Sequence, residues 1–395
     1  MANRQLLAFN YLINGIQRIE EEEYRNAFIT VFSNSLEYNN MMTPYNYPHR
    51  KLHHLFNYHA LPLTTTPVEN VVWGAGKEGA GTFVNCYQRY INAKKYCLSP
   101  FDRYKKRSGD VHTVVSKQEK IAAQLVSSFK ELLDTSRGSL LLCGNSASMP
   151  AIPDRSVDLV ITDPPYFDNI HYSELSNFFY VWLKCLIDHP YFKSDQVPTD
   201  EEAIVNEKLE KSGEEYQDLL SLVFKECERV LKDDGKLIFT FHHTKWEAWW
   251  KLLSAISRGC FRVVDSFPVK SEYKVNPHIR NKQSLDMDLV LICQKRSILF
   301  DPLPLSLENI VEQVTGRRKG DFKGNGNFLY LMGTLLTVAS SHQVDVDVSY
   351  EWFAGILSHY DKFSAAFSES EDVVYDIIKP LQLRLLDANS QEEPD

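Results

Sequence analysis

The chain has 395 residues, of which 44% are hydrophobic and 12% aromatic, and its formal net charge is −9. This composition is typical of a globular protein and excludes an intrinsically disordered chain. The negative charge excludes a protein that binds nucleic acid through an overall basic surface, so any such contact would need local basic patches.

The seven cysteines are scattered along the chain, and no two of them have the CxxC spacing of a zinc ribbon or a redox dithiol. An odd number of isolated cysteines is typical of a reducing compartment. The first residues lack the apolar core and cleavage site of a signal peptide, and no run of 18 apolar residues exists. We therefore expect a cytoplasmic protein without a metal site.

The first part of the chain combines helical patterns with an irregular region. Residues 1–38 have apolar side chains at helical spacing, whereas residues 39–100 are rich in Tyr, Pro, Asn and Gly. Residues 116–133 predict one amphipathic helix, and residues 139–143 predict a strand. The loop GNSASMPAIPDRS follows that strand.

The middle of the chain alternates strands and helices. Strands are expected at VDLVIT, KLIFTF, FRVVDSF and MDLVLIC, and helices at 174–190, at 217–231 and around Trp246, Trp249 and Trp250. Such alternation indicates an α/β protein with a parallel sheet that is covered on both faces. The last two strands are joined only by a loop, so they should form an antiparallel pair at one edge.

The pattern from residue 302 onward is helical again. We therefore expect three consecutive regions: a helical and irregular region at 1–100, an α/β core at 101–297, and a helical region at 298–395. Helical additions would then flank the core at both ends.

Four residues directly after the strand VDLVIT point to chemistry on an amino group. They are Asp163, Pro164, Pro165 and Tyr166, and ligands of open α/β sheets bind beyond the carboxyl ends of strands. The Asp163 carboxylate and the Pro164 carbonyl can both accept hydrogen bonds from one exocyclic amino group. Tyr166 can stack on a base, which is worth about 1–3 kcal/mol. A base inside a duplex cannot reach such a corner, so the nucleotide would be flipped out. The plainer alternative is that two prolines merely end a strand.

The surrounding segment, NSASMPAIPDRSVDLVITDPPYFDNIHYSELSNFFYVWL, resembles motif IV of the amino-methylating DNA methyltransferases. It is most similar to the large adenine-specific DNA methylases, some of which carry a zinc ribbon, and the resemblance extends more loosely over residues 20–295. It implies a Rossmann-like methyltransferase sheet and methyl transfer from S-adenosylmethionine to a base amino group. Asp at the first position of the motif implies adenine N6 rather than cytosine N4.

The resemblance also implies roles for individual residues. The catalytic residues would be Asp163, Pro164, Pro165 and Tyr166, and the substrate-binding residues would include Phe167, Asn169 and Tyr172. Asn145 and Ser146 would contact the cofactor, although the family usually has an Asp where this chain has Asn145.

The cofactor loop of the family, a glycine-rich turn with the pattern Asp-x-Phe-x-Gly-x-Gly, has no convincing copy in this chain. Residues 74–81, GAGKEGAG, have the right glycine spacing but no clear strand before them, and residues 321–327, DFKGNGN, follow a basic stretch. In the family this loop follows a strand that lies beside the DPPY strand. We therefore expect a sheet that lacks its first strands, and a second polypeptide or an upstream segment that supplies the cofactor-binding loop.

DNA is the expected substrate, and three basic stretches could contact its phosphates. The favoured one is the loop between the last two strands, with Lys274 and Arg280 as DNA-binding residues; the others lie at 94–107 and 317–323. A restriction or phage-defence setting would suit such an enzyme. Two alternatives remain: the same chemistry on an RNA or protein amine, and a catalytically degenerate methyltransferase fold that serves as a DNA-binding or specificity subunit.

Overall fold

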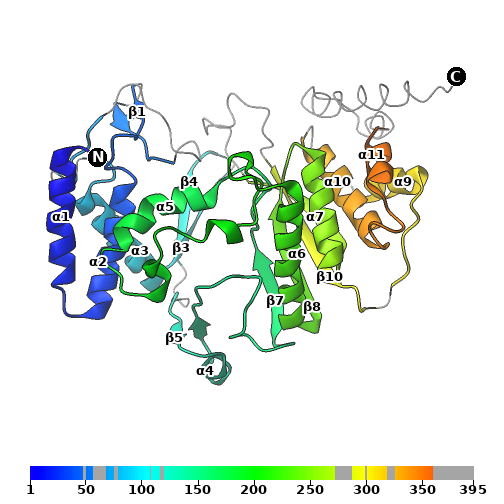
Figure 1. The fold of residues 1–395 in the computed structure, drawn as a ribbon, viewed down its shortest axis with the longest axis horizontal. Coiled ribbons are helices and arrows are strands. Elements are labelled where there is room, and N and C mark those ends of the chain that lie inside the picture. Colours follow the sequence, from blue (N-terminus) through cyan, green and yellow to red (C-terminus); the bar gives the residue numbers. More distant parts are fainter. Residues whose placement is uncertain are drawn as a thin grey trace. The chain divides into compact units, whose positions relative to one another are not determined.

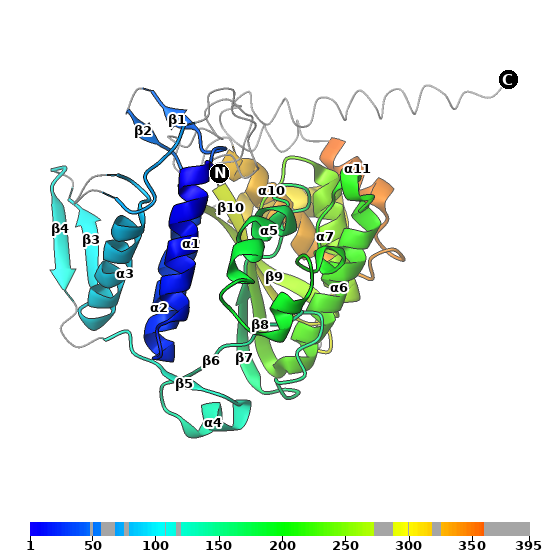
Figure 2. The same cartoon turned by 60° about the vertical axis from the view of Figure 1, so that its left-hand side comes forward.

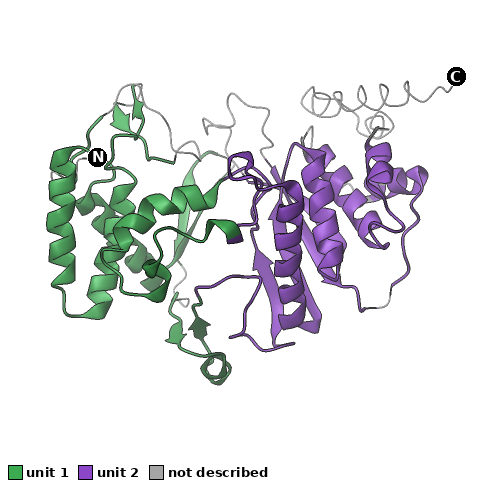
Figure 3. Cartoon of the chain, viewed as in Figure 1, with its two compact units in different colours: residues 1–142, 171–200 green, residues 143–170, 201–395 purple. Residues whose placement is uncertain are grey.

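The computed structural model describes residues 1–47, 50–56, 68–74, 79–106, 108–115, 120–271, 287–298, 300–317 and 325–358 (Figure 1). These residues fall into two compact units that interleave along the chain. The first contains residues 1–142 and 171–200, and the second contains residues 143–170 and 201–395 (Figure 3). The three consecutive regions expected from the sequence stay a prediction, because this division by contacts does not test them.

The first unit is mainly helical. Its helices are α1 (Asn3–Gln17), α2 (Glu22–Leu36), α3 (Phe83–Leu98), α4 (Phe129–Asp134) and α5 (Tyr172–Leu183), and 3-10 turns lie at Pro190–Lys193 and Thr199–Glu201. Phe9 of α1 and Phe32 of α2 are fully buried, and the ring of Trp182 on α5 lies 5.5 Å and 6.4 Å from them. The helical pattern of residues 1–38 is thus confirmed, as two helices that share one core.

The described strands of the first unit form three separate pairs. Antiparallel hairpins join β1 (Tyr45–Asn46) to β2 (Lys51–Leu52) and β3 (Phe101–Lys105) to β4 (Val111–Val115), and β5 (Gln124–Val126) runs parallel to β6 (Gly138–Leu140). The single helix expected at 116–133 is therefore wrong. Ser128 caps the start of α4 by accepting a hydrogen bond from the Glu131 amide, so the helix begins only at Phe129.

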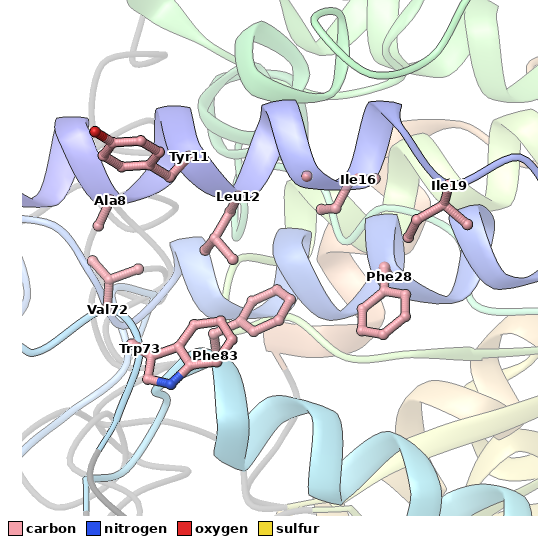
Figure 4. Close-up of a pocket in the computed structure, with 10 residues that line it drawn as sticks. Ala8, Tyr11, Leu12, Ile16, Ile19, Phe28, Val72, Trp73 and Phe83 are labelled. Atoms are coloured by element: carbon pink, nitrogen blue, oxygen red, sulfur yellow. The ribbon is translucent and has the colours of Figure 1, made fainter.

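An apolar cavity of about 490 Å³ lies between α1, α2 and the start of α3 (Figure 4). Leu12 and Ile16 line one side of it, and the rings of Phe28, Trp73 and Phe83 line the other. The Trp73 and Phe83 rings are stacked, with centroids 5.7 Å apart. The cavity belongs to the first unit and contains no residue of the DPPY segment.

The described part of the second unit is built on a four-stranded mixed sheet, so the expected α/β class is confirmed for it, whereas the expected parallel sheet is reduced to one parallel pair of strands. The strands are β7 (Val157–Thr162), β8 (Leu231–Phe241), β9 (Phe261–Lys270) and β10 (Met287–Lys295), in the order β7-β8-β10-β9. β7 and β8 are parallel, whereas β10 is antiparallel to both of its neighbours. The predicted antiparallel pairing of the last two strands is therefore confirmed.

The helices of this unit are α6 (Gly213–Val230), α7 (Trp246–Arg258), α9 (Leu307–Arg317), α10 (Asn325–Ser340) and α11 (Tyr350–Ser358), with a 3-10 turn at Glu207–Leu209. A Ser212–Glu215 capping box starts α6, and the Trp-rich segment forms α7 as predicted. No helix in the described ranges is long and apolar enough to cross a membrane.

The described helices of the second unit bury one face of its sheet and leave the other face partly exposed, so the expected covering of both faces is not seen among the described residues of this unit. The side chains of Leu237, Phe239 and Phe241 are buried, and the Phe239 and Phe241 rings contact Phe224 of α6 and Trp249 of α7. Figure 2 shows α6 and α7 side by side along this face. On the opposite face the side chain of Ile238 stays only partly buried, and Leu159 and Ile161 on β7 are 44% and 72% exposed.

The edge strand β7 pairs only with β8 among the described strands. Its outer N–H and C=O groups therefore have no strand partner in the described part of the chain. An apolar edge strand with exposed aliphatic side chains is the kind of surface to which another strand pairs readily.

Candidate active site

The DPPY residues lie at the carboxyl end of β7, where the sheet presents its loops. Val157, Val160 and Ile161 favour a strand, and Pro164 and Pro165 end it because proline cannot donate a ladder hydrogen bond. Thr162 is paired in register with Phe239 of β8. The next residues of the two parallel strands, Asp163 and Thr240, are therefore neighbours.

Two hydroxyl groups hold the Asp163 carboxylate. The Tyr166 hydroxyl lies 2.7 Å from Asp163 Oδ1, and the Thr240 Oγ1 hydroxyl lies 2.5 Å from the same oxygen. The two hydroxyls are also 2.7 Å apart. The carboxylate is thus oriented by neutral donors, and no cation of the described residues forms an ion pair with it.

This arrangement leaves two acceptors at the end of β7 without a hydrogen bond from the described residues. Asp163 is exposed, and its second oxygen, Oδ2, accepts no hydrogen bond from the described residues. The same holds for the backbone carbonyl of Pro164, whereas the Pro165 carbonyl accepts a hydrogen bond of 3.0 Å from the Tyr216 hydroxyl. The corner is therefore not closed by a buried salt bridge, and the exposed Asp163 carboxylate can accept from an incoming amino group, whereas Pro164 is a buried residue.

Tyr166 is half-buried and is fixed by rings as well as by its hydroxyl. Its ring centroid lies 5.3 Å from that of Phe241 and 4.8 Å from that of His242, both in edge contacts. Burial raises the pKa of Tyr166 far above its ordinary value, so the hydroxyl keeps its proton and remains a donor. Its expected stacking on a base stays a prediction.

Phe167 does not have the position expected of a substrate contact. Its side chain is 3% exposed and packs edge-on against Tyr216 at 5.2 Å, so it belongs to the core. Its φ of 55° is left-handed, which costs about 1–3 kcal/mol for such a residue. Burial of a Phe side chain contributes about 1.5–3 kcal/mol and can offset that strain. The buried ring thus anchors the turn that carries the motif.

Asn145 and Ser146 lie in an exposed loop before β7. The Asn145 amide donates to Glu201 Oε2 at 2.7 Å, and its Oδ1 accepts from the Ala147 amide at 2.8 Å. Both ends of the side chain are thus used within the protein. Their predicted contact with a cofactor stays a prediction.

The other residues expected to bind substrate do not all lie in the unit that contains Asp163. Asn169 is exposed in the loop after the motif, and its amide donates to the Tyr166 carbonyl at 3.0 Å. Tyr172 begins α5 and belongs to the first unit. Lys274 and Arg280 lie outside the described residues.

The described residues do not fit the expected cofactor by themselves. No strand in the described ranges is followed by a glycine-rich turn. Gly74, Gly79 and Gly81 have positive φ angles but follow irregular backbone, and a Cβ on Gly81 would meet the Tyr38 ring at 1.9 Å. Gly79 and Gly81 lie in a turn directly before α3. Within the same described ranges no cluster of side chains could hold a metal ion.

Several residues that hold the corner were not predicted from the sequence. They come from the end of β8 and the loop after it: Thr240 contacts Asp163, His242 pairs with Asp288 of β10, and His243 contacts Asp168 at 2.8 Å. The sequence feature that could have predicted them is the group of three polar residues in Thr-Phe-His-His, at the end of the neighbouring parallel strand. Such residues share the rim on which ligands bind.

A comparison with protein families supports the interpretation of this rim. Residues 157–299 match the family model of a DNA methylase. A search of curated proteins found no match to the chain. The matching segment starts at the first residue of β7 and contains the Asp163 corner and all four strands of the sheet. Residues 157–299 of this chain are therefore similar to the DNA methylases, and this similarity supports the resemblance to the DPPY-type amino-methylating DNA methyltransferases.

Proposed function

We propose that this protein is the catalytic part of a cytoplasmic DNA methyltransferase. It would transfer a methyl group from S-adenosylmethionine to the N6 amino group of an adenine that is flipped out of the duplex. The observation that carries this proposal is the exposed and oriented Asp163 carboxylate, whose Oδ2 accepts no hydrogen bond from the described residues.

The residues of the corner would hold and polarise the amino group. Asp163 Oδ2 and the Pro164 carbonyl would accept its two N–H groups and fix the direction of the nitrogen lone pair. A nitrogen that forms a fourth bond gains positive charge, and an unpaired carboxylate beside it would stabilise that charge until the nitrogen loses one of its two protons to solvent. Tyr166 would contact the base, while Thr240 keeps the carboxylate in place. Positioning and electrostatics would thus supply the contribution of this chain.

Adenine is proposed over cytosine because the motif begins with Asp, as in the adenine-specific methylases that the segment resembles. Lys274 and Arg280 are proposed phosphate contacts, and Asn169 and Tyr172 are proposed to lie near the flipped nucleotide.

The cofactor-binding loop is proposed to come from a second polypeptide or from an upstream segment. The outer edge of β7, which has no strand partner in the described part of the chain, and the exposed side chains of Leu159 and Ile161 support this. Each aliphatic side chain that becomes fully buried contributes about 1.5–3 kcal/mol, so a strand and a helix placed there would be held firmly. Asn145 and Ser146 remain proposed contacts to the cofactor in the completed enzyme.

A second candidate function follows from the same edge. If nothing completes the sheet, the chain is a degenerate methyltransferase fold that binds DNA or serves as a specificity subunit. The absence of a glycine-rich turn after any described strand favours this candidate.

Methyl transfer by the protein purified from its native cells, with whatever polypeptide accompanies it, tests the proposal. The sample receives methyl-labelled S-adenosylmethionine and unmethylated DNA, with RNA or a glutamine-containing protein as competitor. We expect label in N6-methyladenine of the DNA, and no label with Asp163→Ala. Label found in the RNA or the protein instead would show that the enzyme methylates an amino group of that substrate and not of DNA. No label in any of them would favour the degenerate subunit.

A further inference from the structure

His243 is a buried titratable residue next to the corner. It follows β8 in the loop that leads to α7, and its side chain is 3% exposed. Its ring lies edge-on to Phe167 at 5.5 Å, and its carbonyl accepts a hydrogen bond of 2.9 Å from the indole of Trp249. The packing therefore leaves the imidazole little freedom to move.

Both ring nitrogens of His243 have partners, and together they define its tautomer. The Lys245 amide donates to Nδ1 at 3.0 Å, so Nδ1 is an acceptor. The hydrogen must then sit on Nε2, which donates to Asp168 Oδ1 at 2.8 Å. His243 thus presents its Nε2–H group to one carboxylate.

Asp168 receives a second contact at its other oxygen. The Lys245 ammonium binds Oδ2 and remains 58% exposed. The His243 hydrogen bond is the main cause that holds the pKa of Asp168 well below its usual range, and Lys245 adds to it, so the carboxylate is ionised. Asp168 lies five residues after Asp163, on the same loop.

The loop 163–170 is therefore fastened to the end of β8 at two points. Thr240 holds Asp163 at its start, and His243 holds Asp168 near its end. Between them lies Phe167 with its left-handed φ of 55°, a conformation that other contacts must maintain. We propose that His243 is a positioning residue, which keeps the amino-accepting corner in shape through its Nε2–H bond to Asp168.

The proposal makes a prediction that needs no enzymatic activity. Two amide hydrogen bonds report the closed loop: the Asn169 amide donates to the Tyr166 carbonyl, and the Val205 amide donates to the Phe167 carbonyl, both at 3.0 Å. Loss of a hydrogen bond to a charged group should raise the exchange rates of these two amides about tenfold.

Hydrogen–deuterium exchange of the full chain measures this effect in three variants. His243→Leu removes the donor, His243→Gln keeps an N–H donor near the Nε2 position, and His342→Leu is the matched control. His342 lies in the same unit and also makes one partly buried histidine contact, of 2.6 Å, to the Leu303 carbonyl. We expect faster exchange at Asn169 and Val205 in His243→Leu, near-normal exchange in His243→Gln, and no local change in His342→Leu.

The proposal is overturned if His243→Leu exchanges like the wild type, or if His243→Gln exchanges as fast as His243→Leu. Should His243→Leu fail to fold, Asp168→Ala replaces it, because the Asp168 side chain is 30% exposed and outside the core. The same acceleration is expected there, and its absence would equally overturn the proposal.

The consequence for catalysis rests on the proposed function. In the active complex, His243→Leu should lower kcat about tenfold or more and leave the KM for DNA nearly unchanged, with recovery in His243→Gln. If exchange responds as expected but no complex methylates DNA, the positioning role stands and the proposed function fails. If exchange does not respond, the positioning role fails whatever the activity.

Discussion

Asp163 is held by hydroxyl groups rather than by a cation, and this matters for its proposed chemistry. A cation would cancel the carboxylate charge before the substrate arrives. Hydroxyl donors orient the group and leave its negative charge available to an amino nitrogen that becomes positive. Because both hydroxyls of Tyr166 and Thr240 contact Oδ1, the other oxygen is left for the substrate.

Replacement of Thr240 tests this orientation. Thr240→Val keeps the shape and removes the donor, so we expect kcat for methyl transfer to fall about tenfold to a hundredfold, with little change in the KM for DNA. Thr240→Ser keeps the hydroxyl and should retain most of the rate. Initial rates of methyl transfer by the complete enzyme measure this effect. An equal decrease of kcat in the two variants would show that the Thr240 hydroxyl does not orient the carboxylate.

At the level of single residues, the motif could be predicted from the sequence, but the residues that hold it in place could not. Asp163 and Tyr166 form a contiguous signal after an apolar strand, so their place at the rim could be predicted. Thr240 lies 77 residues away along the chain. Its contact depends on the register of β7 against β8, which no local pattern contains. The burial of Phe167 could not be predicted, because an aromatic residue beside the Asp163–Tyr166 motif looks the same in sequence whether it is exposed or buried.

The strand β7 is the element on which the proposed assembly depends. It is parallel to β8, carries the motif at its carboxyl end, and has no partner on its outer edge within the described chain. Ile161 is 72% exposed and contacts no core cluster of the described residues. An exposed β-branched residue on an open edge indicates a contact that this unit does not make by itself.

A charge on β7 should break the proposed assembly without unfolding the chain. Ile161→Lys is expected to leave the melting temperature of the isolated chain nearly unchanged, because the side chain is already exposed. It should abolish co-purification of any polypeptide that completes the sheet. Leu222→Lys is the matched control, since Leu222 is a 48% exposed aliphatic residue on α6 of the same unit. Retention of the partner by Ile161→Lys would place the contact elsewhere.

At the level of elements, apolar patterns located the strands of the sheet and their antiparallel closing pair. The prediction of one helix at residues 116–133 was wrong, because a few apolar residues have helical spacing there although the segment contains a short strand and a short capped helix. Pairing between β5 and β6 decides the structure there, and such pairing is a tertiary interaction that overrides local preference.

The chain combines a segment that matches the DNA methylase family with a helical first unit of different character. The family match covers residues 157–299, and the helical first unit lies largely outside it. The body of the chain is acidic, with a net charge of −9, so DNA binding would depend on local basic patches and would weaken with salt. The fold of the first unit could not be predicted beyond its helices, because its strands are short and its irregular segments carry little periodicity.

Nucleoside mass spectrometry of genomic DNA gives the most direct test of the amino-accepting corner. Native cells that lack the gene are complemented with the wild-type chain or with Asp163→Ala, so that any partner is present in both. We expect N6-methyldeoxyadenosine to return with the wild-type chain and to stay absent with Asp163→Ala. Equal levels of this nucleoside in the two strains, or its replacement by N4-methyldeoxycytidine, would contradict a corner in which Asp163 holds the adenine amino group.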